Sequence, residues 1–204
     1  MSDATAAVLL FDGFEELDAI GPYDVLRTAS DAGAPLDSVT QVTAEPVERV
    51  TASKGTLVTP HGRLDTADPP DYLVVPGGGW VERADTGAWA AAERGVVQEA
   101  IADCHAAGTT VASVCTGAML LARAGLLDGR PAVTHGSATA DLEATDARVV
   151  DARVVDDGDV LTAGGVTAGI DLALWLVERE WGEAVADAVE QTLEYERSPD
   201  VYSA

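Results

Sequence analysis

One junction constrains the fold of this chain more than any other feature. The run Thr109–Val114 is rich in β-branched and small apolar residues, which is typical of a buried strand. A segment rich in Ala, Leu and Met, which is typical of a helix, begins directly after Cys115. Because no linker separates the two, Cys115 must lie on a sharp strand-to-helix turn that lifts its side chain off the sheet edge.

The turn has two open interpretations. Backbone N–H groups at the start of the new helix point toward Cys115, and the positive end of the helix dipole favours the thiolate, which is the nucleophilic form. Gly117 would let this helix approach neighbouring chain closely. Free cysteines are also often buried as small hydrophobic residues. From the local sequence alone, a nucleophile and a core residue are equally good interpretations.

The charge balance limits the possible partners. The 204 residues include 12 Lys and Arg against 35 Asp and Glu, a net charge of -23, and Lys54 is the only lysine. A surface this acidic repels phosphate backbones, which argues against nucleic-acid binding. It also predicts a cytoplasm rich in salt, where counter-ions screen the self-repulsion.

Cysteine usage predicts a reducing compartment. Cys104 and Cys115 are too few for a disulfide framework or a zinc site, and the three histidines lack ligand spacing. Cys104 falls on the apolar stripe of a predicted helix and should pack in the core. The sequence shows neither a signal peptide nor a stretch that could span a membrane, so we expect a soluble, cytoplasmic protein without membrane partners.

Short apolar runs alternate with helical patterns, which predicts one α/β domain over residues 1–204. The expected strands are 6–11, 38–44, 72–75, 109–114, 131–135, 148–155 and 160–163. The expected helices are 21–32, opened by Gly21-Pro22, then 87–107, the segment after Cys115, a weak one after Ser137, 167–181 and 183–196. Two hairpins are expected, one between 47–50 and 56–59 and one across the turn 156–159. The sheet should be mainly parallel and covered on both faces.

Sites in such sheets gather at the carboxyl ends of the strands. Those ends are here the loops 12–18, 76–80, the Cys115 turn and 164–165. The glycines 77–79 could direct an N–H toward the same point as the N–H of Thr116 and so stabilise an anion, although a tight turn alone would need the same glycines. Their spacing is not that of a dinucleotide-binding loop.

Two further side chains could assist a thiol. Asp18 lies where the first loop enters the core, so partial burial should raise its pKa and let it exchange a proton with a nearby cysteine. His135, at a strand end, could pair with Cys115 or be a hydrogen-bonded structural residue. Trp80 could form a pocket wall or cap the core. The expected substrate pocket is lined by Gly79, Trp80, His135 and Gly165.

With these residues placed, the chain resembles the ThiJ/PfpI superfamily, flavodoxin-like proteins related to class I glutamine amidotransferases, and within it the isonitrile hydratase group. The matching stretches are FDGFEELDAIGP (11–22), VVPGG (74–78), SVCTG (113–117), AGLLDGR (124–130), TH (134–135), GGVTAGID (164–171) and LEY (193–195). The resemblance implies a three-layer sandwich with a nucleophile elbow at Cys115 and a homodimer.

The resemblance also implies roles. Cys115 would be the nucleophile, Asp18 its acidic partner, and the amides of Gly78 and Thr116 the anion pocket. In isonitrile hydratases the thiolate is thought to add to the terminal isonitrile carbon, and water then hydrolyses the thioimidate to an N-substituted formamide. This chemistry implies a small-molecule substrate and needs neither a metal nor an organic cofactor.

Some residues depart from the group or separate it from its relatives. Gly136 stands where the group usually carries Trp, and the C-terminal region is curtailed at Ala204. Thr116 argues against glyoxalases, deglycases and proteases, which usually place His after the cysteine, and the absent His-x-Glu pair argues against an amidotransferase. The non-enzymatic alternatives are a redox or ligand sensor with Cys115 as an oxidisable thiol, and the sensing half of a transcription regulator, which would need an added DNA-binding module.

Overall fold

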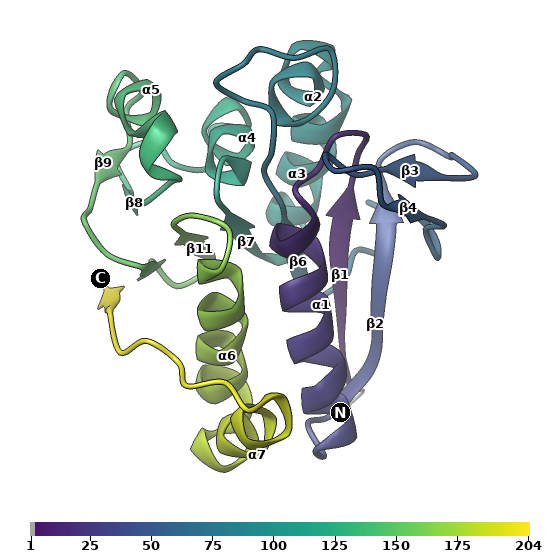
Figure 1. Cartoon of the computed structure of the whole chain (residues 1–204), viewed down its shortest axis with the longest axis vertical. Coiled ribbons are helices and arrows are strands. Elements are labelled where there is room, and N and C mark those ends of the chain that lie inside the picture. The colour runs from purple at the N-terminus through teal and green to yellow at the C-terminus, as the bar shows by residue number, and fades with distance from the viewer. Residues whose placement is uncertain (1–2) are drawn as a thin grey trace.

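The computed structural model of the chain describes residues 3–204 and confirms a mainly parallel sheet with helices around it (Figure 1). The main sheet has the strand order β12-β10-β11-β7-β6-β1-β2-β5. Neighbouring strands run parallel, apart from the antiparallel pair of β10 and β11. The strands are β1 (Ala4–Leu10), β2 (Leu36–Thr43), β5 (Gly62–Arg63), β6 (Tyr72–Val75), β7 (Thr110–Val114), β10 (Val154–Asp156), β11 (Val160–Ala163) and β12 (Val201–Ser203).

Helices cover both faces of this sheet, as Figure 1 shows. On one face α1 (Glu16–Asp31), α6 (Ala168–Trp181) and α7 (Glu183–Leu193) pack against one another. On the other face α2 (Ala88–Arg94), α3 (Val96–Ala106) and α4 (Gly117–Arg123) form a second group. The helices of residues 3–204 are too short or too polar to serve as membrane spans.

The core forms because the central strands are apolar on both sides. Residues 6–10 of β1, 73–75 of β6 and 111–114 of β7 are buried, as a parallel sheet between two helical layers requires. Gly117 at the start of α4 permits the close packing expected of it, because a Cβ there would lie 2.3 Å from the carbonyl oxygen of Val75. The small residue therefore brings α4 directly onto the end of β6.

Two expected helices have different limits. The first helix begins at Glu16 rather than at Gly21, so Asp18 lies in its first turn and Pro22 lies inside it. The acidic side chains of that first turn are favourable near the positive end of the helix dipole. The helix expected over 87–107 is two helices, because Gly95 adopts φ +87° and ends α2 before α3 begins.

Several strands also differ from expectation. The run 131–135 holds only β8 (Pro131–Ala132), which pairs with β9 (Arg148–Val149) in a small separate sheet. The run 148–155 is therefore split between β9 and β10. The edge strands β5 and β12 were not expected, since each is too short to carry a pattern. Both hairpins are confirmed, as β3 (Val50–Thr51) with β4 (Leu57–Val58) and as β10 with β11.

Two short elements complete the list of helices and connect the small sheet to the site. A 3-10 turn covers Gly136–Ala138, and α5 covers Thr139–Glu143 directly after it. In Figure 1 α5 lies close to β8 and β9, on the side of the molecule where β7 passes into α4. The segment after β8 is therefore placed to reach the end of β7.

Candidate active site

The Cys115 turn is strained and firmly held. Cys115 lies between β7 and α4 with φ +59°, a left-handed conformation that a residue with a side chain adopts only at a cost. Its N–H donates to the carbonyl oxygens of Ala163 (3.0 Å) and Gly164 (2.8 Å), and the Thr134 hydroxyl donates to its carbonyl oxygen (2.9 Å). The end of β11 and the segment after β8 thus fix the sharp turn expected from the sequence.

Asp18 lies beside the thiol in a fully buried position. Its side chain is 0% exposed, and Oδ2 accepts the N–H of Gly77 at 2.9 Å. Oδ1 has no N–H or O–H partner within residues 3–204, and the carboxyl interacts with the Cys115 thiol. Burial raises the pKa of Asp18 to about 7, more than the Gly77 N–H and the thiol lower it. The expected rise of this pKa is confirmed.

The charge state of Cys115 differs from expectation. Burial, and next the negative charge of Asp18, raise the pKa of the Cys115 thiol to about 12. The backbone N–H groups of Val166 and Thr116 lower the pKa of the thiol and oppose this rise only in part. The expectation that the helix start would favour the thiolate is therefore wrong for the resting site, because loss of water outweighs the dipole of a short helix.

The anion pocket expected from Gly78 and Thr116 is partly engaged within the protein. The Thr116 N–H faces the sulfur, whereas the Gly78 N–H donates to Thr116 Oγ1 at 2.9 Å. Gly77 must lack a side chain, because a Cβ there would lie 2.5 Å from both the Thr116 nitrogen and Oγ1. The structure therefore brings the two loops together, and rotation of the Thr116 side chain would free the Gly78 N–H.

A cavity of about 180 Å³ opens above the sulfur. It is lined by Glu15, Gly78, Gly79, Trp80, Val81, Glu82, Cys115, Thr116, His135, Ser137 and Val166. Of the residues expected to line the pocket, only Gly165 is absent from this wall of the described chain. It lies behind His135 instead, since a Cβ on Gly165 would be 2.7 Å from His135 Cδ2. Small dimensions suit a small substrate.

Trp80 fulfils both of its expected roles. It lines the cavity, yet it is only 3% exposed and packs edge-on against Trp89 at 5.1 Å between ring centroids. Its Nε1–H donates to Asp141 Oδ2 at 2.7 Å, which ties the loop after β6 to α5. The tryptophan is therefore a fixed apolar wall.

His135 faces the cavity and, within the described residues, has no hydrogen bond to Cys115. Its Nδ1 accepts the Ser137 N–H at 3.1 Å, so the neutral ring carries its proton on Nε2. Ser137 Oγ also lies 2.7 Å from Nδ1. A fixed tautomer of this kind makes Nε2–H a hydrogen-bond donor to a molecule in the cavity.

Two contacts at the site were not predicted from the sequence. Glu15 forms an ion pair with Lys54, and the Ser53 hydroxyl donates to Glu15 (3.0 Å) and to Glu16 (2.9 Å), so the β3–β4 hairpin reaches the cavity mouth. The isolation of one lysine in an acidic chain was the available signal. Val166, whose φ is +25°, supplies a second N–H to the sulfur, and no sequence pattern indicated it.

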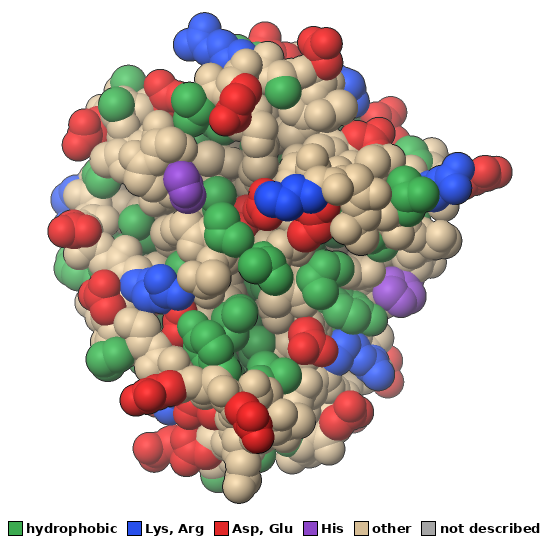
Figure 2. All heavy atoms as spheres, in the orientation of Figure 1, with side chains coloured by type: hydrophobic (Ala, Val, Ile, Leu, Met, Phe, Trp, Pro, Cys, Tyr) green, Lys and Arg blue, Asp and Glu red, His purple; other side chains and the backbone are tan. Residues whose placement is uncertain are grey.

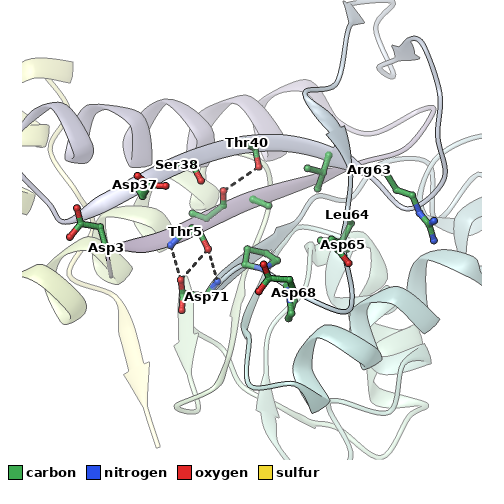
Figure 3. A pocket seen from close by; sticks show the side chains of 15 residues that line it. Asp3, Thr5, Asp37, Ser38, Thr40, Arg63, Leu64, Asp65, Asp68 and Asp71 are labelled. Carbon is green, nitrogen blue, oxygen red and sulfur yellow. Dashed lines mark hydrogen bonds between the residues drawn. The ribbon is translucent and has the colours of Figure 1, made fainter. Parts of the chain in front are cut away.

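A larger groove, of about 760 Å³, lies at the opposite, amino ends of the strands (Figure 3). Asp71 and Thr5 are hydrogen-bonded there: Asp71 Oδ2 accepts both the N–H (2.7 Å) and the hydroxyl (3.0 Å) of Thr5. Arg63 lies at one end of the groove, and its Nε donates to the carbonyl oxygen of Ala44 at 3.1 Å. Residues 3–204 contain no group of three or more His, Cys, Asp and Glu side chains that could hold a metal ion.

Comparison with known proteins agrees with the geometry. The sequence profile of the DJ-1/PfpI family matches residues 4–179. The chain belongs to the DJ-1/PfpI family. Among curated members, isonitrile hydratase of Pseudomonas putida is 36% identical over 191 residues, which cover 94% of this chain and 78% of that protein.

Other proteins similar to this chain carry different descriptions. The transcriptional regulator GbdR of Pseudomonas aeruginosa is 32% identical over 73% of this chain, and the match covers 39% of the regulator. The crystal structure of Drosophila melanogaster DJ-1beta superposes with a TM-score of 0.81 at 27% identity, covering 96% of this chain and all of that one. The fold and the family are thus established, while the family's functions are diverse.

Proposed function

We propose that this protein is a cysteine-dependent hydratase that converts a small isonitrile and water into an N-substituted formamide. The observation that carries the proposal is a buried pair: Cys115 lines a small cavity, and the fully buried carboxyl of Asp18 interacts with its thiol. The 36% identity to isonitrile hydratase of Pseudomonas putida supports the choice of substrate class.

The first step follows from the charge states of the pair. Because the pKa of Asp18 is about 7 and that of the thiol about 12, the resting site holds the thiol, and the Asp18 carboxylate acts as its base. The sulfur attacks the terminal carbon of R–N≡C as its proton passes to Asp18. Asp18 then returns this proton to the same carbon, which gives the thioimidate R–N=CH–S–Cys115.

The second step consumes water. Asp18 removes a proton from a water molecule that adds to the thioimidate carbon and passes this proton to the nitrogen. The tetrahedral adduct R–NH–CH(OH)–S–Cys115 then collapses: the C–S bond breaks, the hydroxyl proton passes to the sulfur through Asp18, and R–NH–CHO leaves. The His135 Nε2–H and the Thr116 N–H are the donors available to the nitrogen and oxygen atoms that gain charge.

The walls of the cavity fit a neutral, fairly apolar molecule. Trp80, Val81 and Val166 supply apolar surface, and Glu15 and Glu82 would repel an anion. The described lining residues include neither Lys nor Arg. An isonitrile carries no net charge, so it meets these conditions.

The test is incubation with cyclohexyl isocyanide in molar KCl, with N-cyclohexylformamide measured by mass spectrometry. Wild type should form the product, Cys115→Ala should form none with an unchanged circular dichroism spectrum, and Asp18→Asn should be slower by about 100-fold or more, as for loss of a general base. Formamide production by Cys115→Ala at the wild-type rate would refute the mechanism. If wild type makes no product but oxidises to a stable Cys115 sulfinic acid, the sensor hypothesis is favoured.

We also propose that the protein is a homodimer in a salt-rich cytoplasm. Leu17 (46% exposed) and Ile20 (36% exposed) lie on α1, and Ile170 of α6 packs beside Gly21. Figure 2 shows apolar side chains gathered over α1 and α6, with carboxylates around them. An exposed apolar patch with a polar rim is typical of an interface. Light scattering should give twice the chain mass of 21.0 kDa, and Ile20→Lys should give the monomer.

A further inference from the structure

Val166 lines the cavity together with Cys115, and the Cys115 N–H donates to the carbonyl oxygen of Gly164, two residues before Val166, at 2.8 Å. The Val166 N–H also acts to lower the pKa of the Cys115 thiol. Val166 has φ +25°, which is unfavourable for a β-branched residue. A strained conformation persists only where its surroundings hold it. Contacts from residues outside the segment 164–167 must therefore hold it, and these contacts set the direction of the Val166 N–H.

Arg153, the residue before β10, contacts both ends of this segment. Its carbonyl oxygen accepts the Gly164 N–H at 3.0 Å. Its guanidinium donates from Nη2 to Thr167 Oγ1 at 3.0 Å and from Nε to Asp171 Oδ2 at 2.5 Å. Arg153 therefore contacts the residue before Gly165-Val166 through its main chain and the residue after them through its side chain.

Asp171 holds Arg153 in place and is itself fully satisfied. It is 2% exposed, in the first turn of α6, and it also accepts the Tyr195 hydroxyl (3.0 Å) and the Ser198 N–H (2.7 Å). Asp200 Oδ2 accepts the N–H of Arg153 at 3.0 Å. The segment 195–200 therefore closes over the ion pair from the C-terminal side and orients the guanidinium.

We propose that Arg153, oriented by Asp171 and the segment 195–200, is a positioning residue that keeps the Val166 N–H directed at the Cys115 sulfur. The inference concerns the thiol itself, and it rests on the proposed function only for its effect on turnover. Without the Arg153 side-chain contacts, the Val166 backbone leaves its strained conformation, and its N–H no longer points at the sulfur. Hydrogen bonds favour the charged form of their acceptor, so the thiol becomes harder to ionise.

The other groups that face the sulfur come from different elements. Asp18 belongs to α1, Glu15 precedes that helix, Glu82 follows β6 and His135 follows β8. None of these four contacts Arg153 among the described hydrogen bonds and ion pairs. A change at Arg153 should therefore reach the thiol through the segment 164–167.

The experiment measures alkylation of Cys115 by iodoacetamide against pH, followed by mass spectrometry of the Cys115 peptide. Thr167→Val cuts only the guanidinium contact, because the exposed Thr167 side chain makes no capping bond to α6. Arg153→Gln removes the guanidinium contacts with both Thr167 and Asp171. We expect alkylation at pH 8.5 to slow about 3-fold for Thr167→Val and about 10-fold for Arg153→Gln, a factor of ten being one pH unit in thiol pKa. Arg153→Lys should recover part of the rate.

Arg179→Gln is the matched control, since it also removes an arginine from a buried carboxylate (Asp156, 5% exposed, 2.9 Å). It should keep the wild-type pH profile even if it lowers stability. Unshifted profiles for Thr167→Val and Arg153→Gln, or an equal shift for Arg179→Gln, would overturn the inference. Alkylation needs no isonitrile, so a wild type inactive on cyclohexyl isocyanide with shifted Arg153 variants would refute the proposed function alone.

Discussion

The burial of Asp18 predicts that its replacement by asparagine stabilises the protein at alkaline pH. Burial, the main cause, raises the pKa of this carboxyl from 3.8 to about 7. Folding therefore favours the protonated form. The stability that this preference contributes is complete below pH 3.8 and is lost as the pH rises through about 7.

The magnitude follows from that difference. About three pH units at about 1.4 kcal/mol each make the ionised Asp18 cost about 4 kcal/mol of unfolding free energy above pH 7. The asparagine side chain of the Asp18→Asn variant cannot ionise, and its carbonyl oxygen can still accept the Gly77 N–H. The stability of Asp18→Asn relative to wild type should therefore rise by about 3 kcal/mol between pH 5 and pH 8.5, since part of the cost is already present at pH 5.

The assay is urea unfolding of wild type and Asp18→Asn at both pH values, at one KCl concentration. Asp24→Asn is the control, because Asp24 is an exposed residue of the same helix and the substitution changes the net charge equally. It should show little difference between the two pH values. An Asp18→Asn variant whose relative stability does not change with pH, or falls, would refute the reasoning about burial.

Three other predictions follow from a close contact, from the strained backbone of Cys115 and from the net charge. Gly165→Ala should lose about 1–3 kcal/mol in urea unfolding, since its Cβ would lie 2.7 Å from His135, whereas Gly136→Ala, with open space, should be neutral; equal effects would contradict this. Cys115→Gly should be about 1 kcal/mol more stable than Cys115→Ala, because φ +59° penalises any Cβ; the reverse order would show that the turn is unstrained. The melting temperature should rise by several degrees from 0.1 M to about 2 M KCl if the charge of -23 reflects a salt-rich cytoplasm, and an unchanged value would exclude it.

Much of the fold could be predicted because the buried strands carry a strong pattern. The apolar runs that became β1, β6, β7 and β11 are buried on both sides, so each stands out in the sequence as a short continuous run of apolar residues. The edge strands β5 and β12 have two and three residues, and pairing with a neighbour rather than pattern defines them. Gly21-Pro22 was misleading as a helix start, because proline favours the first turn of a helix, whereas Pro22 lies inside the helix that already began at Glu16.

The composition of the site could also be predicted, whereas its electrostatics could not. Strand order alone placed the loops of Asp18, Gly78 and Cys115 at one sheet edge. The pKa of the thiol depends on how completely water is removed and on the distance to one carboxyl, and neither quantity is written in local sequence. The role of Val166 depends on contacts from Arg153, thirteen positions earlier along the chain.

The same burial that destabilises the fold fits Asp18 to its proposed task. An exposed carboxyl would be ionised near neutral pH and would be a poor acid toward the isonitrile carbon. With a pKa of about 7, Asp18 is found in both forms, so it can accept the thiol proton and donate it in the next event. The thiol, held neutral until that transfer, gains charge only when substrate is present, which also limits its oxidation in the empty site. A stabilised Asp18→Asn variant should therefore be a much slower enzyme, as expected where stability and activity oppose each other at a buried charge.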